Sequence, residues 1–162
     1  MILESQRMLK PTTKDYAEYF RLSLEAGLCR EDEIESWAYK MIIETNPPVP
    51  NWLLSLSTDG EISKNKLLQS VPGEADQNVT WSLLLARLST AYRAKHFSRI
   101  QIVEVIFRWI SAGVIPSQFL QGAAKLDQSL DGMIDGWGSE DQFIKDFEDF
   151  LVPFRSFQSL LP

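Results

Sequence analysis

Apolar residues recur every three or four positions along most of this chain, which is the spacing of one face of an α-helix. The first such segment places four apolar residues on one face: Tyr16, Tyr19, Phe20 and Leu24. Thr12 precedes Asp15 by three positions, a pattern typical of a capped helix N-terminus. We expect this helix to end at Gly27, because glycine readily adopts the left-handed backbone that closes helices.

The next predicted helix covers residues 31–45. Its apolar positions are Ile34, Trp37, Ala38, Met41 and Ile42. Its first turns carry four carboxylates: Glu31, Asp32, Glu33 and Glu35. The helix dipole favours negative charge at that end. Asn46, Pro47 and Pro48 should end the helix, because proline cannot continue the hydrogen-bond ladder.

Two short segments follow these prolines. Residues 50–57 hold a short apolar run, which fits either a short helix or a buried strand. We favour the helix, because no neighbouring segment offers a strand to pair with. Residues 63–71 have the pattern of another short helix, which Pro72 and Gly73 should end.

The second half of the chain predicts four longer helices, at residues 80–95, 98–113, 118–130 and 140–151. Ser98 with Gln101, and Ser139 with Gln142, have the spacing of capping boxes. Three glycines mark the loop between the last two helices: Gly132, Gly136 and Gly138. The segment 152–162 is rich in phenylalanine and leucine, so we expect it to dock on the rest of the protein.

These patterns predict an all-α fold, an irregular bundle of six to eight helices with little or no β-structure. Heptads do not persist long enough for a coiled coil. We expect one helical domain over residues 1–162, with the tail 152–162 docked on it. Trp37, Trp81 and Trp109 occupy core positions of the predicted helices, where their large area would be buried.

The composition is that of an ordinary globular protein, with 44% apolar and 23% charged residues among 162. The single cysteine, Cys29, excludes an intramolecular disulfide and suits a reducing compartment. The first residues have no basic region followed by an apolar one, so we expect no signal peptide. Apolar runs do not approach the roughly 18 residues that span a bilayer. We therefore expect a cytoplasmic protein without membrane contact.

The net charge of −6 is unevenly spread. Residues 1–80 carry 8 basic and 13 acidic side chains, residues 81–125 carry 6 and 1, and residues 126–162 carry 2 and 8. The acidic total argues against a nucleic-acid binder, which gains affinity from cations that neutralise phosphates. The basic middle segment would either pack beside the acidic C-terminal segment, which we favour, or meet an outside partner.

Candidate chemistry is sparse. The one histidine, His96, stands at a predicted helix end, where it would face terminal carbonyls. Glycine loops for phosphate, a GxSxG motif and paired CxxC motifs are all missing from the sequence. Asp127, Asp131 and Asp135 recur every four residues, but they match no calcium loop and are interpreted as a solvated face. We expect no enzyme, cofactor or metal site, although converging carboxylates stay open.

The segment 31–57 resembles small, uncharacterised, all-helical bacterial proteins of immunity-protein type. The elements that carry this resemblance are Glu33, Trp37, Ala38, Ile42, Pro47, Pro48, Trp52, Ser55, Leu56 and Ser57. Immunity proteins bind and neutralise a cognate toxin. The resemblance implies a shared corner of the core rather than the toxin site, and it implies no catalytic residue.

The sequence therefore predicts a non-enzymatic protein-binding domain, interpreted as a bacterial immunity protein that neutralises a basic toxin through an acidic surface. The candidate partner-binding residues form two acidic clusters and two loop tryptophans: Glu31, Asp32, Glu33, Glu35, Trp52, Trp137, Glu140, Asp141, Asp146, Glu148 and Asp149. The alternative is a structural or regulatory adaptor that binds a host protein or forms a homo-oligomer through an exposed apolar patch.

Overall fold

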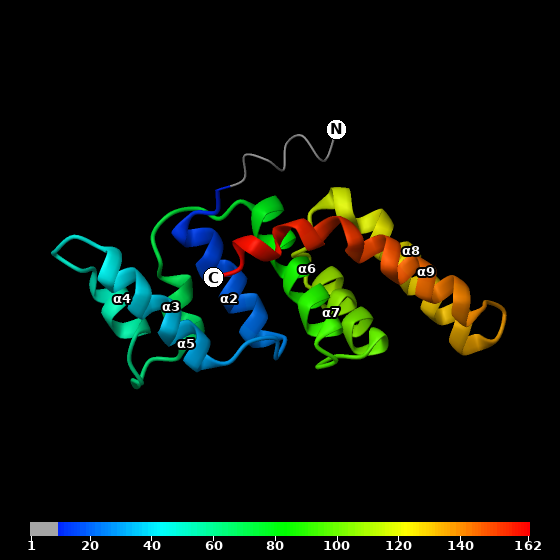
Figure 1. Cartoon of the computed structure of the whole chain (residues 1–162), viewed down its shortest axis with the longest axis horizontal. Helices are drawn as coiled ribbons and strands as arrows, with labels where there is room; N and C mark the ends of the chain where they lie inside the picture. Colours follow the sequence, from blue (N-terminus) through cyan, green and yellow to red (C-terminus); the bar gives the residue numbers. More distant parts are fainter. Residues whose placement is uncertain (1–9) are drawn as a thin grey trace. The chain divides into compact units, whose positions relative to one another are not determined.

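The computed structural model describes residues 10–162, which form eight α-helices and one 3-10 helix (Figure 1). The helices are α2 (Thr13–Glu25), α3 (Glu31–Glu44), α4 (Asn51–Leu56), α5 (Lys64–Gln69), α6 (Gln77–Arg93), α7 (Arg99–Ser111), α8 (Ser117–Asp135), α9 (Glu140–Leu151) and η2 (Val152–Leu160). The described residues contain no strand. The all-α prediction is confirmed, and the ambiguous segment 50–57 is helical.

The chain divides into two compact units. Unit 1 ends at Thr80 and also includes Pro162, and unit 2 is Trp81–Leu161. The single domain expected from the sequence stays a prediction, because two compact units can belong to one domain or to two.

In unit 1, α2 packs against α5 and α3 packs against α4. The predicted cap of α2 is present: the Asp15 amide donates to Thr12 Oγ1 (3.2 Å) and the Thr12 amide donates to Asp15 Oδ2 (2.7 Å). The other oxygen of this buried carboxylate accepts the amide of Asp76 (2.7 Å). Asp76 Oδ1 in turn accepts the amide of Asn78 (2.8 Å). Asp76 thus caps the first turn of α6, which explains why this helix begins before the predicted residue 80.

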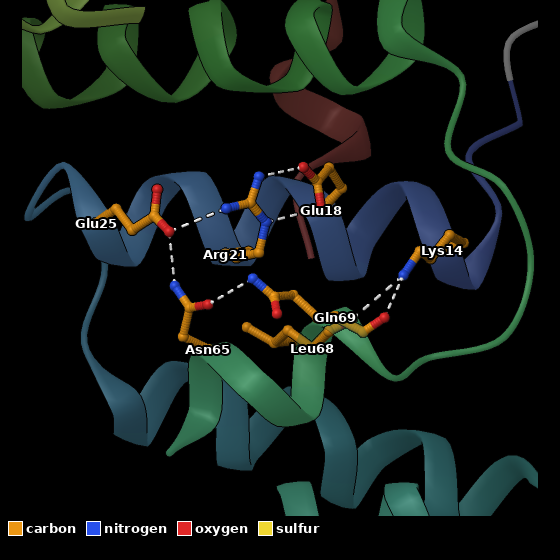
Figure 2. A network of polar contacts seen from close by, with 7 residues as sticks. All are labelled: Lys14, Glu18, Arg21, Glu25, Asn65, Leu68 and Gln69. Atoms are coloured by element: carbon orange, nitrogen blue, oxygen red, sulfur yellow. Dashed lines mark hydrogen bonds and ion pairs between the residues drawn. The ribbon is translucent and has the colours of Figure 1, made fainter. Parts of the chain in front are cut away.

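A polar seam joins α2 to α5 along their exposed edge, as Figure 2 shows. Lys14 Nζ donates to the carbonyl of Gln69 (2.9 Å), near the last turn of α5. Arg21 donates to the carboxylates of Glu18 and Glu25, and Asn65 reaches the same Glu25 oxygen (2.6 Å). The seam therefore fixes the direction of the short helix α5 along α2.

The strongest charge constraint in unit 1 is Lys64, whose side chain is only 3% exposed. Its Nζ forms an ion pair with Glu35 Oε1 (3.1 Å) on α3. It also donates to the carbonyl of Leu56 (3.1 Å) at the end of α4 and to the carbonyl of Thr58. A buried ammonium group requires such oxygen partners, because desolvation costs several kcal/mol. Lys64 thus ties α5 to both α3 and α4.

Unit 2 has an aromatic core. Trp81 and Trp109 meet edge to face with their ring centroids 5.0 Å apart, and both are buried as predicted. The 3-10 helix η2 follows α9, and its Phe154 and Phe157 are buried. Phe154 contacts Phe119 of α8 across 5.6 Å between centroids.

One predicted boundary in unit 2 is wrong: α8 does not stop at residue 130 but runs through Gly132 to Asp135. The ring of Trp137 folds back onto Gly132, where a Cβ atom would stand 2.9 Å from the ring. Gly132 is therefore a packing position inside the helix. The left-handed residue that ends α8 is Gly136, at φ 79°.

Among the described non-glycine residues, Lys95 alone has a left-handed backbone, at φ 60°. It closes α6: its amide donates to the Tyr92 carbonyl, and the His96 amide donates to the Ala91 carbonyl, both at 2.9 Å. Glycine is the usual residue here, because a Cβ atom costs about 1 kcal/mol or more in this conformation. The sequence pattern gave no sign of this strained lysine.

We expect Lys64→Met to lower the free energy of unfolding by about 3 kcal/mol, because it leaves Glu35 and two carbonyls without their cation. Lys66→Met, on the exposed side of the same helix, should change it by less than about 0.5 kcal/mol. Urea unfolding followed by circular dichroism measures both. Equal effects of the two substitutions would contradict the role given to Lys64.

We expect Lys95→Gly to raise the free energy of unfolding by about 1 kcal/mol, since glycine adopts the left-handed backbone without the Cβ penalty. Lys95→Ala keeps the Cβ atom and should not stabilise. Comparing the two variants by thermal unfolding separates the backbone effect from the loss of the lysine side chain. A stabilisation shared by both would trace it to the lost charge instead.

Candidate partner-binding site

The acidic cluster at the start of α3 is largely compensated within unit 1. The guanidinium of Arg30 holds Asp32 through two hydrogen bonds of 3.0 and 2.5 Å, which lower the pKa of Asp32. Glu33 accepts the amide of Arg30 (3.2 Å), and Glu35 is paired with Lys64. Glu31 is exposed. Two of the four carboxylates on this predicted surface, Asp32 and Glu35, are thus paired with cations of unit 1.

The acidic cluster on α9 is split by the helix geometry. Glu140, Asp141 and Asp149 are exposed, whereas Glu148 is half-buried and accepts a hydrogen bond from Arg155 (2.7 Å). Asp146 is 6% exposed and lines a pocket beside Trp137, between α8 and α9. Three side chains of α8 and α9 already hold its carboxylate, so Asp146 is less available to a partner than the exposed acids of this cluster.

Asp146 organises the α8–α9 pair. It accepts hydrogen bonds from the Ser129 hydroxyl, from Lys125 Nζ (3.1 Å) and from Gln142 Nε2 (3.0 Å). The Ser129 hydrogen bond, with smaller contributions from Lys125 and Gln142, lowers the pKa of Asp146 despite its burial. Through Lys125, the basic middle segment does pair with the acidic C-terminal segment.

The second predicted capping box is only half formed. Ser139 Oγ accepts the amide of Gln142 (3.1 Å), but the Gln142 side chain turns toward Asp146 instead of returning to the cap. The first one, between Ser98 and Gln101, is complete.

The two loop tryptophans differ from each other. Trp52 is half-buried on α4. Trp137 is 67% exposed, although one face of its ring covers Gly132. Only Trp137 presents enough apolar surface for a partner.

A groove between α7 and α8 was not among the predicted sites. It encloses about 670 Å³ and lies wholly within unit 2. Its lining residues are Val103, Glu104, Phe107, Arg108, Asp127, Leu130 and Asp131. Val103 and Leu130 are buried, while Phe107 is 49% exposed. An exposed phenylalanine beside three carboxylates combines an apolar anchor with negative charge.

Helix periodicity extends both sides of this groove. On α7, four exposed residues share one face: Ile100, Glu104, Phe107 and Ser111. On α8, the corresponding face comprises Leu120, Ala124, Asp127, Asp131 and Ile134, of which Asp127 is half-buried and the others are exposed. The middle members of both stripes line the groove. Each stripe is thus acidic in the middle and apolar toward at least one end.

Negative charge in the groove exceeds positive charge. Arg108 is the one cation among the lining residues, against Glu104, Asp127 and Asp131. Burial, and then the neighbouring charge of Asp131, raises the pKa of Asp127. The two carboxylates therefore repel each other, and a cation that entered the groove would relieve this repulsion.

The sequence carried a partial signal for this groove. The spacing of Asp127, Asp131 and Asp135 was visible, but it was interpreted as a solvated face. The missing element was Phe107, because an apolar residue on a strongly apolar helix gives no sign of pointing outward. Contact between the two helices was needed to place it beside the aspartates.

Other candidate chemistry is limited in the part of the chain that the structure describes. Cys29 is buried, and its thiol lies 3.7 Å from the Phe20 carbonyl. Residues 10–162 contain no cluster of three or more histidine, cysteine, aspartate or glutamate side chains placed to hold a metal. No helix within these residues combines the length and apolar character needed to cross a membrane.

Comparisons with known proteins give no match to a family model, a curated protein or a solved structure.

The lowered pKa of Asp146 predicts a pH-dependent contribution to stability. A carboxylate whose pKa is depressed by folding stabilises the native state above its ordinary pKa of 3.8, and this contribution is lost as the pH falls through the folded-state value. We expect Asp146→Asn to cost about 1–2 kcal/mol at neutral pH, and the difference from wild type to shrink below about pH 4.

Urea unfolding between about pH 3 and pH 7 measures this difference. Asp149→Asn is the matched control, because Asp149 lies on the same helix and is exposed. A cost that stayed constant over the whole pH range would contradict the proposed hydrogen bonds to the Asp146 carboxylate.

Proposed function

We propose that this protein is a non-enzymatic binding protein whose groove between α7 and α8 receives a basic segment of a protein partner. The observation that carries the proposal is the exposed ring of Phe107 beside Glu104, Asp127 and Asp131. A partner that covers this ring removes its apolar area from water, and opposite charges beside the ring speed the encounter and fix the register.

The shape of the groove favours a helical segment as the partner. Two neighbouring helices with exposed stripes form the kind of groove into which an amphipathic helix lays its apolar face. The apolar residues Ile100 and Ile134 lie on the two stripes, and Ile134 is 65% exposed. A partner helix with lysine or arginine in its middle and apolar residues toward its ends would match both stripes.

Electrostatics would act mainly on the rate of association. Opposite charges steer encounters and can raise association rates by more than tenfold at low salt. A cation between Asp127 and Asp131 would also stabilise their charged forms, so binding would lower the raised pKa of Asp127. Affinity should therefore fall as the pH approaches that pKa from above.

Neutralisation of a basic toxin, as in immunity proteins, is the biological role that we favour for this binding. Toxins that attack nucleic acid are basic for the reason that phosphate binding requires cations. The resemblance of the segment 31–57 to immunity-type proteins supports this role. Trp37, Ala38 and Leu56 of that segment are buried, which suits a shared structural corner in unit 1 rather than a toxin-binding surface.

An adaptor that self-associates is the second candidate. Tyr39 and Ile43 stand one turn apart on α3 and are 61% and 69% exposed, which gives unit 1 an apolar pair without cover in the described chain. The C-terminal tail does not add to such a patch, because Phe154 and Phe157 are buried in unit 2. Analytical ultracentrifugation of wild type and Ile43→Lys distinguishes a dimer through this pair from a monomer.

The groove is tested with a synthetic amphipathic helical peptide of leucine and lysine as the probe. We expect Asp131→Lys to reduce its association rate about tenfold at low salt, and Phe107→Ala to reduce its affinity about tenfold through faster dissociation. Stopped-flow fluorescence at two salt concentrations measures both rate constants. Asp149→Lys changes the net charge equally on another helix and should alter the association rate less than about twofold.

Equal losses for Asp131→Lys and Asp149→Lys would mean that only net charge matters, and would overturn the groove as the binding site.

Reversal of Glu31 and Asp32 tests the α3 surface in the same assay. Glu35 is left unchanged there, because a lysine at that position would face the buried Lys64 and unfold unit 1. A benzophenone amino acid at position 107 would capture the natural partner, whose binding must then show the same dependence on Asp131.

A further inference from the structure

A second concave site lies at the corner between α6 and α7, apart from the groove residues. It encloses about 510 Å³, within the range of small-molecule sites, and all its lining residues belong to unit 2. Three basic side chains line it, Lys95, His96 and Arg99, together with one carboxylate, Glu140. Lysine and arginine are permanently charged at neutral pH, so cations outnumber the carboxylate.

Arg99 is held in place but is not satisfied. Its guanidinium lies over the ring of Tyr92, 5.4 Å from the centroid, and Tyr92 packs edge to face on Phe147. This stack fixes the orientation of the charge. The Nε atom of Arg99 is buried and has no hydrogen-bond partner. A buried donor is costly to leave unpaired, and the guanidinium that carries it lines the pocket.

Lys95 reaches this site through the strained backbone described above. A left-handed non-glycine residue persists only where the surrounding structure or a function demands it, and here the lysine lines the pocket. The pocket also includes Ser98 and the first residues of α7, where the helix dipole adds positive potential. Side-chain charges and helix dipole therefore have the same sign.

The other wall of the pocket is apolar. Its members are Phe97, Met133, Phe143 and Ile144. A bare inorganic anion would leave this wall uncovered, whereas a ligand with an apolar or aromatic body would bury it. The pocket thus combines a cationic end with an apolar side.

We propose that the α6–α7 corner is a binding site for a small organic anion, a carboxylate or phosphate ester that carries an aromatic or similar apolar body. The anionic group would lie near Lys95 and Arg99, and the apolar body would lie against the half-buried side chains Phe97, Met133 and Ile144. Glu140 opposes the anion and weakens binding. The site shares only Ile100 with the stripes of the proposed protein-binding groove, and its charged residues are different ones.

The test is an NMR titration of ¹⁵N-labelled protein with phenyl phosphate, benzoate and inorganic phosphate. We expect saturable shifts of amides in residues 95–101 with phenyl phosphate, and roughly tenfold weaker binding of inorganic phosphate, which lacks the apolar body. Benzoate distinguishes a preference for a carboxylate from one for a phosphate ester. Titrations without saturable shifts in residues 95–101 for any of the three probes would overturn the proposal.

Three variants are expected to change the affinity for phenyl phosphate in opposite directions, which a general loss of structure would not do. Lys95→Gly removes a cation while relieving backbone strain, so it should weaken phenyl phosphate binding several-fold in a protein of higher thermal stability. Arg99→Gln should weaken binding at least tenfold, and Glu140→Gln should strengthen it several-fold. Arg108→Gln, which removes an exposed cation from the same helix outside the pocket, is the matched control.

Unchanged binding in Lys95→Gly together with unchanged binding in Glu140→Gln would show that the charges of the pocket do not hold the probe, and would overturn the assignment. A loss in Arg108→Gln equal to that in Arg99→Gln would overturn it as well, because the effect would then follow from net charge alone.

Discussion

The buried ammonium group of Lys64 is the constraint on which unit 1 depends. Its oxygen partners come from Glu35 on α3 and from the carbonyls of Leu56 and Thr58 at the end of α4. A six-residue helix such as α5 has no stability of its own, because nucleating a helix is costly. Its place is therefore set by contacts at its two ends: Lys64 at the first turn, and Lys14 of α2 on the carbonyls near its last turn. Removing the charge of Lys64 would break the polar contacts of α5 with α3 and with the end of α4.

The same internal pairing decides which acids are left for other molecules. Asp32, Glu35 and Asp146 are held by cations or by hydrogen bonds within the fold. Asp127 and Asp131 instead repel each other. Burial of Asp127, and then this repulsion, raises the pKa of Asp127. A count of acidic residues along the chain would favour α3 and α9, whereas the groove between α7 and α8 combines two neighbouring carboxylates with an exposed aromatic ring.

Local sequence signals predicted most of the helices, because the periodicity of buried residues and the caps at Thr12 and Ser98 act over a few positions. They failed where a distant residue decides the outcome. Gly132 stays helical because the ring of Trp137 covers it, and α6 starts early because Asp76 is fixed by Asp15. The burial of Asp146 escaped the sequence for the same reason. Asp146 and Asp149 look alike in sequence, and only the packing of α9 against α8 separates a buried acid from an exposed one.

The helix α7 shows how one element serves the core and two sites at once. Its buried face, with Ile102, Val103, Val105, Ile106 and Trp109, is wide and apolar, so packing alone holds the helix in place. Several residues outside that face, such as Glu104 and Phe107, are exposed. Arg99 at its start faces the corner with α6, and Glu104 and Phe107 face the groove with α8. Because the first carries positive charge and the second negative charge, a single rigid helix presents opposite potentials at two sites. The two proposed ligands, of opposite sign, would therefore bind different charged residues, and Ile100 alone belongs to both surfaces.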